Sequence, residues 1–214
     1  MEEIRHFEIL KHIDVGVRKF EISSTSQEYR NVLEQLGTGM DHLLRVYPQH
    51  LFNVNVKISR IENLILLAQY EAQKRKVEWL LATEKSTLPA ERKLFHVTSK
   101  TAADKICEEE YNRSFAGSVY GTTLGSGTYF GTGAAVAAYR GECIFMAKVL
   151  TGKFYKGDSS VSGVNLSPKF HSTVNNVKNP TVFVVYHDAA AYPEYLIEVA
   201  AASINPVEPL KDYQ

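Results

Sequence analysis

Two short apolar stretches each carry one side chain that a plain core strand would not need. Residues 94–98 (LFHVT) contain His96, and residues 125–130 (GSGTYF) contain Tyr129. A lone histidine or tyrosine in an apolar strand is more often packed in a core than bound to a ligand. The two become candidates for chemistry only if the fold brings both stretches to one place.

Several common catalytic and binding motifs are absent. The chain has no Walker lysine motif, no His-Glu-x-x-His zinc motif and no Gly-x-Ser-x-Gly nucleophile elbow. Residues 125–131 (GSGTYFG) differ from a dinucleotide fingerprint, because the third glycine comes one place late and no long helix with a following acidic residue is evident. His171 and His187 have no further metal-ligand residues at useful spacing, so we expect no metal site.

The length, net charge and cysteine content of the chain predict a soluble intracellular protein, cytoplasmic or nuclear. The 214 residues include 24 basic and 24 acidic ones, and zero net charge argues against broad electrostatic capture of nucleic acid or of an anionic membrane. Cys107 and Cys143 lie far apart in the sequence, which suits a reducing compartment, and a single disulfide between them is the alternative. The chain begins without a signal-peptide pattern and contains no apolar run long enough to span a bilayer.

The elements that must position His96 and Tyr129 mix strands and helices without regular alternation. Thr25 and Glu28 have the spacing of a capping box, which predicts a helix over residues 23–45. This irregular order predicts an α+β fold with an antiparallel or mixed sheet. The remaining expected elements are a half-buried strand at 52–58, a helix at 62–82, a strand at 94–98, a helix at 101–110, a helical turn at 134–139, strands at 144–150, 182–186 and 195–199, and a long loop at 151–180.

The charged segment 74–76 (KRK) admits two interpretations. It is either a nucleic-acid patch or the solvated face of the helix expected over residues 62–82. Glu71 and Glu78 flank the three basic residues, and this mixture of signs favours the solvated face.

Six blocks in a fixed order resemble the catalytic domain of the poly(ADP-ribose) polymerase superfamily, in the mono-ADP-ribosylating branch carried by macrodomain-bearing members. The resemblance covers roughly residues 15–199, with an extension at 1–14 and a tail at 200–214. It implies an ADP-ribosyltransferase fold, two facing and mostly antiparallel sheets with helices packed outside. The blocks are 94–96 (LFH), 111–114 (YNRS), 127–130 (GTYF), 149–152 (VLTG), 182–186 (VFVVY) and 192–197 (YPEYLI).

The resemblance implies an NAD pocket between the two stretches. His96 would hydrogen-bond the adenosine ribose of NAD, and Tyr129 would stack on nicotinamide. Tyr139 would close the other face of the ring at a shifted spacing. The backbone of Val97, followed by Thr98, would hold the carboxamide. Arg113 would begin the loop that flanks the adenosine side.

Four positions depart from the family pattern. Val97 replaces the glycine after the histidine, and Ala137 replaces a serine whose hydroxyl would donate to the carboxamide, a contact worth about 1–3 kcal/mol if it is buried. Val182 stands where chain-elongating members are expected to have their acidic catalytic residue, which predicts no polymer synthesis. His171 stands where an aspartate is usual.

The expected function is transfer of one ADP-ribose from NAD to a protein side chain, including side chains of the chain itself, with release of nicotinamide. NAD is then a substrate, and protein acceptors are the partners; no membrane or nucleic-acid partner is expected. The alternative is an inactive transferase fold that binds NAD, ADP-ribose or another protein. Val97 and Ala137 favour this alternative, and His96 and Tyr129 favour the enzyme.

Overall fold

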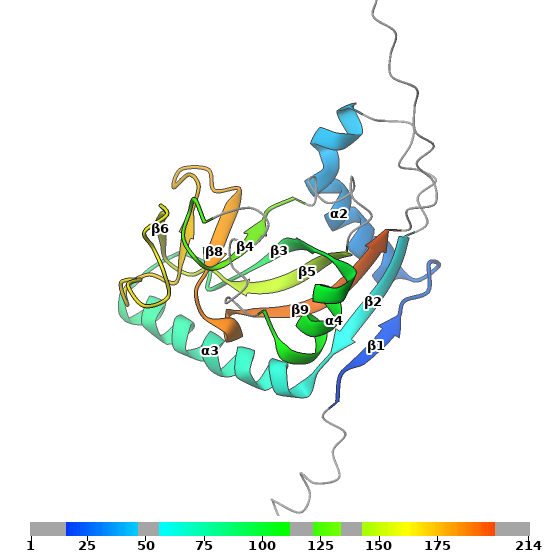
Figure 1. The fold of residues 1–214 in the computed structure, drawn as a ribbon, viewed down its shortest axis with the longest axis horizontal. Coiled ribbons are helices and arrows are strands. Elements are labelled where there is room, and N and C mark those ends of the chain that lie inside the picture. The colour runs from blue at the N-terminus through cyan, green and yellow to red at the C-terminus, as the bar shows by residue number, and fades with distance from the viewer. Residues whose placement is uncertain (1–15, 47–55, 112–121, 134–142, 200–214) are drawn as a thin grey trace, which may run out of the picture.

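The computed structural model describes residues 16–46, 56–111, 122–133 and 143–199. These residues form an α+β fold, as the sequence predicts, with the elements shown in Figure 1. The helices are α2 (Gln27–Val46), α3 (Leu64–Thr83), α4 (Lys100–Glu109) and the short 3-10 helix η3 (Asp188–Ala190). The strands are β1 (Arg18–Glu21), β2 (Val56–Glu62), β3 (Glu91–Thr98), β4 (Thr128–Gly131), β5 (Cys143–Leu150), β6 (Phe154–Lys156), β7 (Ser172–Val174), β8 (Val182–Val185) and β9 (Ala191–Val199).

The strands form one nine-stranded sheet in the order β1-β2-β9-β5-β3-β4-β8-β7-β6. All neighbours are antiparallel except the β6–β7 pair at one edge. The two facing sheets expected from the resemblance are thus joined into one. The junction is narrow, because the single residue pair Phe95–Gly131 links β3 to β4. By contrast, all eight residues of β3 pair with β5.

Helices cover both faces of the larger half of the sheet. Leu66, Tyr70, Val77 and Leu81 of α3 are buried in the main core, which also contains residues of α4. Val32 of α2 belongs to a second cluster, on the opposite face. The apolar residues of β3 alternate between the two clusters, as the period of two in a strand requires. Leu94 therefore faces α3, and Phe95 faces α2.

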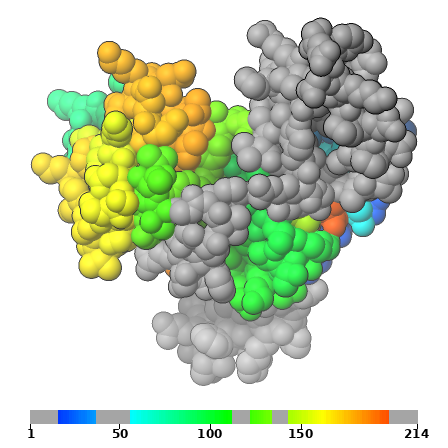
Figure 2. All heavy atoms as spheres, turned by 45° about the horizontal axis from the view of Figure 1, so that its top comes forward, coloured from blue at the N-terminus to red at the C-terminus, as the bar shows by residue number. Residues whose placement is uncertain are grey.

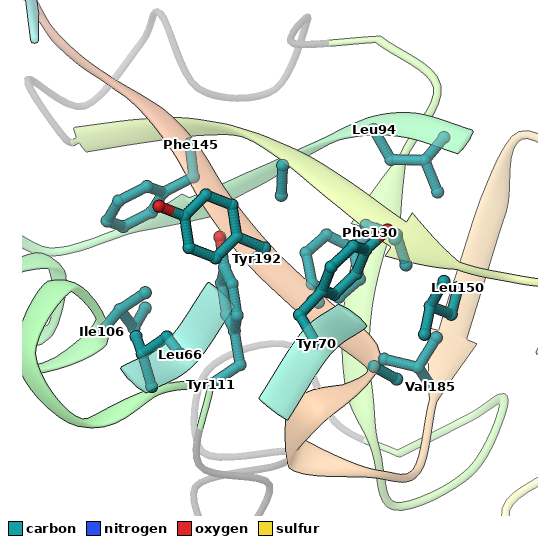
Figure 3. Packing of buried hydrophobic residues seen from close by; sticks show 14 of the residues in the cluster. Leu66, Tyr70, Leu94, Ile106, Tyr111, Phe130, Phe145, Leu150, Val185 and Tyr192 are labelled. Carbon is teal, nitrogen blue, oxygen red and sulfur yellow. The ribbon is translucent and has the colours of Figure 1, made fainter. Parts of the chain in front are cut away.

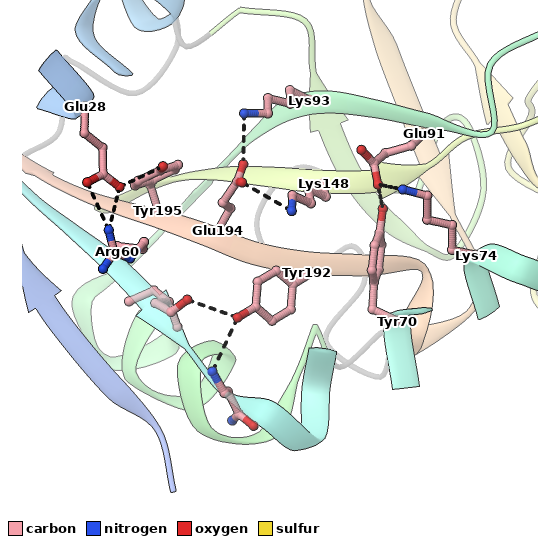
Figure 4. A network of polar contacts seen from close by, with 12 residues as sticks. Glu28, Arg60, Tyr70, Lys74, Glu91, Lys93, Lys148, Tyr192, Glu194 and Tyr195 are labelled. Carbon is pink, nitrogen blue, oxygen red and sulfur yellow. Dashed lines mark hydrogen bonds and ion pairs between the residues drawn. The ribbon is translucent and has the colours of Figure 1, made fainter. Parts of the chain in front are cut away.

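The start of α2 differs from the expected capping box by one residue. The Ser26 hydroxyl, rather than that of Thr25, accepts a hydrogen bond from the Tyr29 backbone N–H at 3.1 Å. Glu28 does not return to the cap. Its carboxylate instead accepts from Arg60 of β2 at 2.9 Å and from the Tyr195 hydroxyl of β9 at 3.0 Å (Figure 4). The prediction of a helix here is confirmed, and Glu28 connects the helix to β2 and β9 of the sheet.

Two short strands were missed in the region expected to be a loop at 151–180. β6 and β7 each have three residues and pair in parallel at the edge of the sheet. Residues 153–185 gather at one end of the molecule, coloured yellow to orange in Figure 2. Residues 52–55 of the strand expected at 52–58 and the helical turn expected at 134–139 lie outside the described residues.

Candidate NAD-binding site

His96 lies where β3 and β4 separate. If their pairing continued beyond Phe95–Gly131, Val97 would lie opposite Tyr129, but no such backbone pair forms. Instead, Nδ1 of the His96 ring lies 2.8 Å from the main-chain oxygen of Tyr129. A carbonyl oxygen can only accept, so Nδ1 must donate. We call residues 96–98 and 128–130 the β3–β4 junction.

This contact fixes the chemical role of the other ring nitrogen. In a neutral imidazole with its proton on Nδ1, Nε2 is a hydrogen-bond acceptor. Burial lowers the pKa of His96, and the bond to Tyr129 opposes that shift without cancelling it. The ring is therefore neutral at pH 7, and Nε2 can accept from a donor such as a sugar hydroxyl.

Aromatic rings hold His96 in place on the α3 side of the sheet. Tyr111 and Phe130 each have their ring centroid 5.4 Å from that of His96, Tyr111 in an edge-on geometry. Tyr111 is 2% exposed and packs in the main core (Figure 3), and among the described residues its hydroxyl has no hydrogen-bond partner. Sequence reasoning placed Tyr111 in one of the family blocks but gave it no role, because nothing in its neighbouring residues indicates contact with His96.

Tyr129 is anchored by its hydroxyl to the glycine-containing turn before it. This hydroxyl donates to the Gly125 carbonyl at 2.9 Å and accepts from the Leu124 backbone N–H at 3.0 Å. Its ring packs against a small cluster that includes Val184 and Tyr186. The side chain is half-buried, so a well-fixed aromatic surface remains partly accessible.

Crowding explains both glycines of the Gly-x-Gly pattern. Gly125 has φ +121°, a conformation that L side chains rarely adopt, and a Cβ there would lie 2.0 Å from the Tyr186 hydroxyl. A Cβ at Gly127 would lie 2.4 Å from the Val185 carbonyl oxygen. Tyr186 in turn donates to the Leu124 carbonyl at 2.9 Å. The turn is therefore packed directly against β8, which positions Tyr129.

The side chain of Val97 points away from His96. It packs against the cluster under α2 that contains Phe95 and Ile144, while His96 lies on the α3 side. Its β-branched side chain therefore does not occupy the His96 side of the junction. The backbone of Val97 has no partner in β4 among the described residues. Thr98, half-buried, ends β3 opposite Cys143.

Val182 is the one remaining predicted site residue that the structure describes, and it lies apart from His96. Val182 lies on β8 opposite Gly131, so the whole of β4 separates it from β3. Its role in excluding polymer synthesis stays a prediction. Arg113, Ala137 and Tyr139 lie outside the described residues.

His171, which the resemblance places where an aspartate is expected, bonds the backbone of Lys153. Its Nδ1 accepts a hydrogen bond from the Lys153 backbone N–H at 3.1 Å, a bond that a carboxylate would also accept. The backbone N–H of His171 donates to the Lys153 carbonyl at 2.8 Å. Nε2 then carries the proton, and it is buried with no hydrogen-bond partner among the described residues. Gly152 leaves room for the ring, since a Cβ there would lie 2.5 Å from Nδ1.

Comparison with known proteins identifies the family of the chain. The family model for the poly(ADP-ribose) polymerase catalytic domain matches residues 26–178. The chain belongs to the poly(ADP-ribose) polymerase catalytic domain family. Within this family it is 32% identical over 207 residues to mouse protein mono-ADP-ribosyltransferase PARP12, covering 92% of the chain and 27% of that protein. It is 29% identical over 195 residues to mouse protein mono-ADP-ribosyltransferase PARP10, covering 82% of the chain and 19% of that protein.

A shorter relative, mouse protein mono-ADP-ribosyltransferase PARP11, is 28% identical over 221 residues, covering 86% of the chain and 61% of that protein. The chain thus spans about a quarter of the PARP12 relative and less than two thirds of each of these proteins. In the described part of this poly(ADP-ribose) polymerase-family chain, no three His, Cys, Asp or Glu side chains are grouped to hold a metal ion. None of its described helices meets the length and hydropathy of a membrane span.

Proposed function

We propose that this chain transfers one ADP-ribose from NAD to a protein side chain and releases nicotinamide. The observation that carries the proposal is the bond from His96 Nδ1 to the Tyr129 carbonyl at the β3–β4 junction. It leaves Nε2 as an acceptor, and the ribose hydroxyls of NAD are donors. Membership of the family supplies the reaction class.

The chemistry demands positioning more than proton transfer. The bond between C1′ of the ribose and the nicotinamide nitrogen breaks, and nicotinamide leaves with the electron pair. The acceptor side chain forms the new bond to C1′: an ionised Glu or Asp attacks through a carboxylate oxygen, whereas a Ser or Cys also loses its proton to solvent. His96 would orient the adenosine ribose, the Tyr129 ring would stack on nicotinamide, and the Val97 backbone would hold the carboxamide. Holding the reactants in this way can supply several kcal/mol of the barrier reduction.

Transfer of single units is supported by the names of the relatives, each a protein mono-ADP-ribosyltransferase. Val182 supports it too, because an apolar side chain at that position cannot orient an acceptor hydroxyl of a growing polymer. The acceptor would be a Glu, Asp, Cys or Ser side chain, on another protein or on this chain.

The proposed catalytic domain extends over residues 15–199, beyond the matched segment 26–178 at both ends. β1 and β9 support these limits, because both belong to the sheet. We also propose a cytoplasmic or nuclear location, which the two free and buried cysteines support. Fluorescence microscopy of the tagged chain in cells tests the location.

Titration calorimetry with NAD beside an automodification assay tests the function. We expect NAD binding, together with a mass increase of one or a few single ADP-ribose units on intact protein. His96→Ala should lose both. The matched control is His187→Asn, which replaces an exposed histidine and keeps an acceptor for the Ala189 N–H.

Other results would contradict the proposal in distinct ways. Long polymer ladders with labelled NAD would overturn transfer of single units. Binding of NAD without transfer would support the inactive transferase fold, and absence of binding would leave only an interaction role.

A further inference from the structure

Tyr111, which follows α4, contacts both strands of the β3–β4 junction. Its ring centroid lies 5.4 Å from that of His96 on β3 and 5.2 Å from that of Phe130 on β4. The centroids of His96 and Phe130 are also 5.4 Å apart, so the three rings contact one another in pairs. Because one backbone residue pair joins the two strands, the Tyr111 ring adds a side-chain link beside the point where their pairing ends.

The Tyr111 ring covers one side of the His96 imidazole. The two ring planes are nearly perpendicular, at 87°, an arrangement that aromatic pairs favour. Tyr111 is buried, whereas His96 is half-buried. The side of the imidazole that contacts Tyr111 is therefore closed to solvent, and the accessible part of the ring lies elsewhere. An imidazole held between this ring and the Tyr129 carbonyl has little freedom to rotate.

Among the described residues, no charged side chain shifts the pKa of His96. Burial lowers this pKa, and the bond to Tyr129 opposes the shift. Tyr111 is the titratable side chain in contact with the imidazole, and burial raises the pKa of its phenol well above the usual value. Tyr111 is thus neutral at pH 7 and acts on His96 by excluding water. Without its ring, water would reach the imidazole and weaken the effect of burial on the pKa of His96.

The backbone directly before Tyr111 has a conformation typical of glycine. Glu110 has φ 106° and ψ 176°, a region that L side chains rarely adopt. Its N–H donates to the Ile106 carbonyl at the end of α4, and the next residue enters the main core, where the Tyr111 ring lies 5.9 Å from that of Phe145 (Figure 3). Such strain persists only where surrounding contacts hold it, so the packing of Tyr111 imposes this backbone conformation.

Asn63 holds the end of α4 from which Tyr111 departs. Its side-chain oxygen accepts from the first backbone N–H groups of α3 and caps that helix. Its NH2 group donates to the carbonyls of Cys107 at 3.0 Å and Glu108 at 3.3 Å, in the last turn of α4. Asn63 is 4% exposed, so water cannot readily replace these bonds. One amide therefore fixes the last turn of α4 relative to the start of α3.

We propose that Tyr111 is a positioning residue of the transferase site, which acts through His96 and is itself positioned by Asn63. Its ring keeps the imidazole turned so that Nδ1 donates to the Tyr129 carbonyl and Nε2 remains an acceptor. The consequence for NAD rests on the proposed function, whereas the effect on the imidazole does not. Because His96 would contact the adenosine ribose, away from the bond that breaks, Tyr111 should affect the KM for NAD more than kcat.

Nitrogen-15 NMR of the histidine side chains, on the full chain without NAD, tests the effect on His96 directly. The shifts of Nδ1 and Nε2 distinguish the two neutral tautomers and follow protonation, and His96→Ala identifies the His96 signals. We expect the wild type to show the tautomer with its proton on Nδ1. Tyr111→Leu should give a mixture of tautomers, with the pKa of His96 raised toward its usual 6.5. Tyr111→Phe keeps the ring and should match the wild type.

Kinetics and two further variants complete the test. Tyr111→Leu should raise the KM for NAD about tenfold or more, equivalent to about 1.4 kcal/mol, and change kcat less than about threefold. Asn63→Asp keeps the oxygen that caps α3 but loses the NH2 group that holds α4. It should shift the His96 signals in the same direction, and it tests the proposal even if Tyr111→Leu does not fold. The matched control is Tyr70→Leu, an equally buried core tyrosine whose ring contacts Tyr192, which should leave the His96 signals unchanged.

Three results would overturn the proposal. Unchanged His96 signals in Tyr111→Leu would mean that the ring does not position the imidazole. A raised KM without a change in these signals would mean that Tyr111 affects NAD by another route. Wild-type signals in a folded Asn63→Asp variant would remove the role of Asn63. Absence of NAD binding to the wild type would overturn the proposed function alone, because the NMR comparison still decides whether Tyr111 positions His96.

Discussion

Where the backbone pairing of β3 and β4 ends, Nδ1 of the His96 ring donates a hydrogen bond to the Tyr129 carbonyl at 2.8 Å. One bond thus joins the two stretches that the sequence singles out, and it orients the imidazole. Because a carbonyl cannot donate, the bond also decides which nitrogen carries the proton. The Nε2 atom of His96, which would contact NAD, is therefore a hydrogen-bond acceptor before NAD binds.

This relationship predicts the pH dependence of NAD binding. The neutral ring is needed for acceptance at Nε2, and burial places the pKa of His96 below its usual 6.5. We expect the dissociation constant for NAD to be constant at pH 7–8 and to rise only as the pH falls well below 6.5. Calorimetry across this range, at fixed ionic strength, measures it. Stronger binding at low pH would mean that the imidazolium, acting as a donor, is the binding form.

His171 predicts a pH dependence of stability. Burial lowers its pKa, and the charges facing it are Glu84, which opposes the shift, and Lys153 and Lys76, which add to it. The unfolded histidine, with the higher pKa, takes up a proton first as the pH falls. The free energy of unfolding should therefore be greatest above pH 6.5 and fall as the pH decreases through the folded-state pKa.

His171→Asn isolates this effect, because an amide oxygen can still accept from the Lys153 N–H but does not titrate. Urea unfolding at pH 7.5 and 5.5 should show a smaller loss of stability for this variant than for the wild type. Equal losses would assign the pH dependence to other groups, His96 among them.

Tyr111→Phe should stabilise the protein. The Tyr111 hydroxyl is buried and has no partner in the part of the chain that the structure describes, and such a group costs about 1–3 kcal/mol relative to a satisfied one. Removing it keeps the ring against His96 and should raise the free energy of unfolding by about 1 kcal/mol. Tyr192→Phe is the matched comparison and should destabilise, since that hydroxyl donates to the Ile61 carbonyl at 3.0 Å. A loss of stability in Tyr111→Phe would mean that a water satisfies the hydroxyl.

Local sequence patterns predicted most of the helices and strands. The strands and side-chain directions that were not predicted depend on contacts between residues far apart in the sequence. The apolar, β-rich run of β5 and the apolar spacing of α3 are local signals, and both elements were predicted to within two residues at each end. β6 and β7 are too short for a periodic signal, and their strand conformation depends on each other. The side-chain directions of Val97 and Tyr111 were equally hidden, because they depend on which strands and helices pack on each face of β3.

Gly127, in the turn before Tyr129, should tolerate a change to alanine less well than Gly131 does. Gly127→Ala would place a Cβ 2.4 Å from a backbone oxygen, which cannot move aside, whereas at Gly131 the nearest atom is 3.1 Å away. We expect Gly127→Ala to cost about 1–3 kcal/mol or more and to displace Tyr129. Gly131→Ala should cost clearly less. Thermal melts and NAD binding of the two variants provide the comparison, and similar losses would contradict the crowding argument.

The position of Val97 changes the expected route to tighter NAD binding. Restoring the family residues at both departures, with Val97→Gly and Ala137→Ser, is expected to strengthen binding about tenfold, or about 1.4 kcal/mol. Since the Val97 side chain packs under α2, Val97→Gly alone should leave NAD affinity unchanged. It should instead lower the free energy of unfolding by about 2 kcal/mol, through lost burial and added backbone freedom.

Ala137→Ser alone should then give the whole gain in affinity. Calorimetry and urea unfolding of the two single variants and the double variant separate these effects. A tighter dissociation constant in Val97→Gly would mean that the valine side chain obstructs the ligand after all.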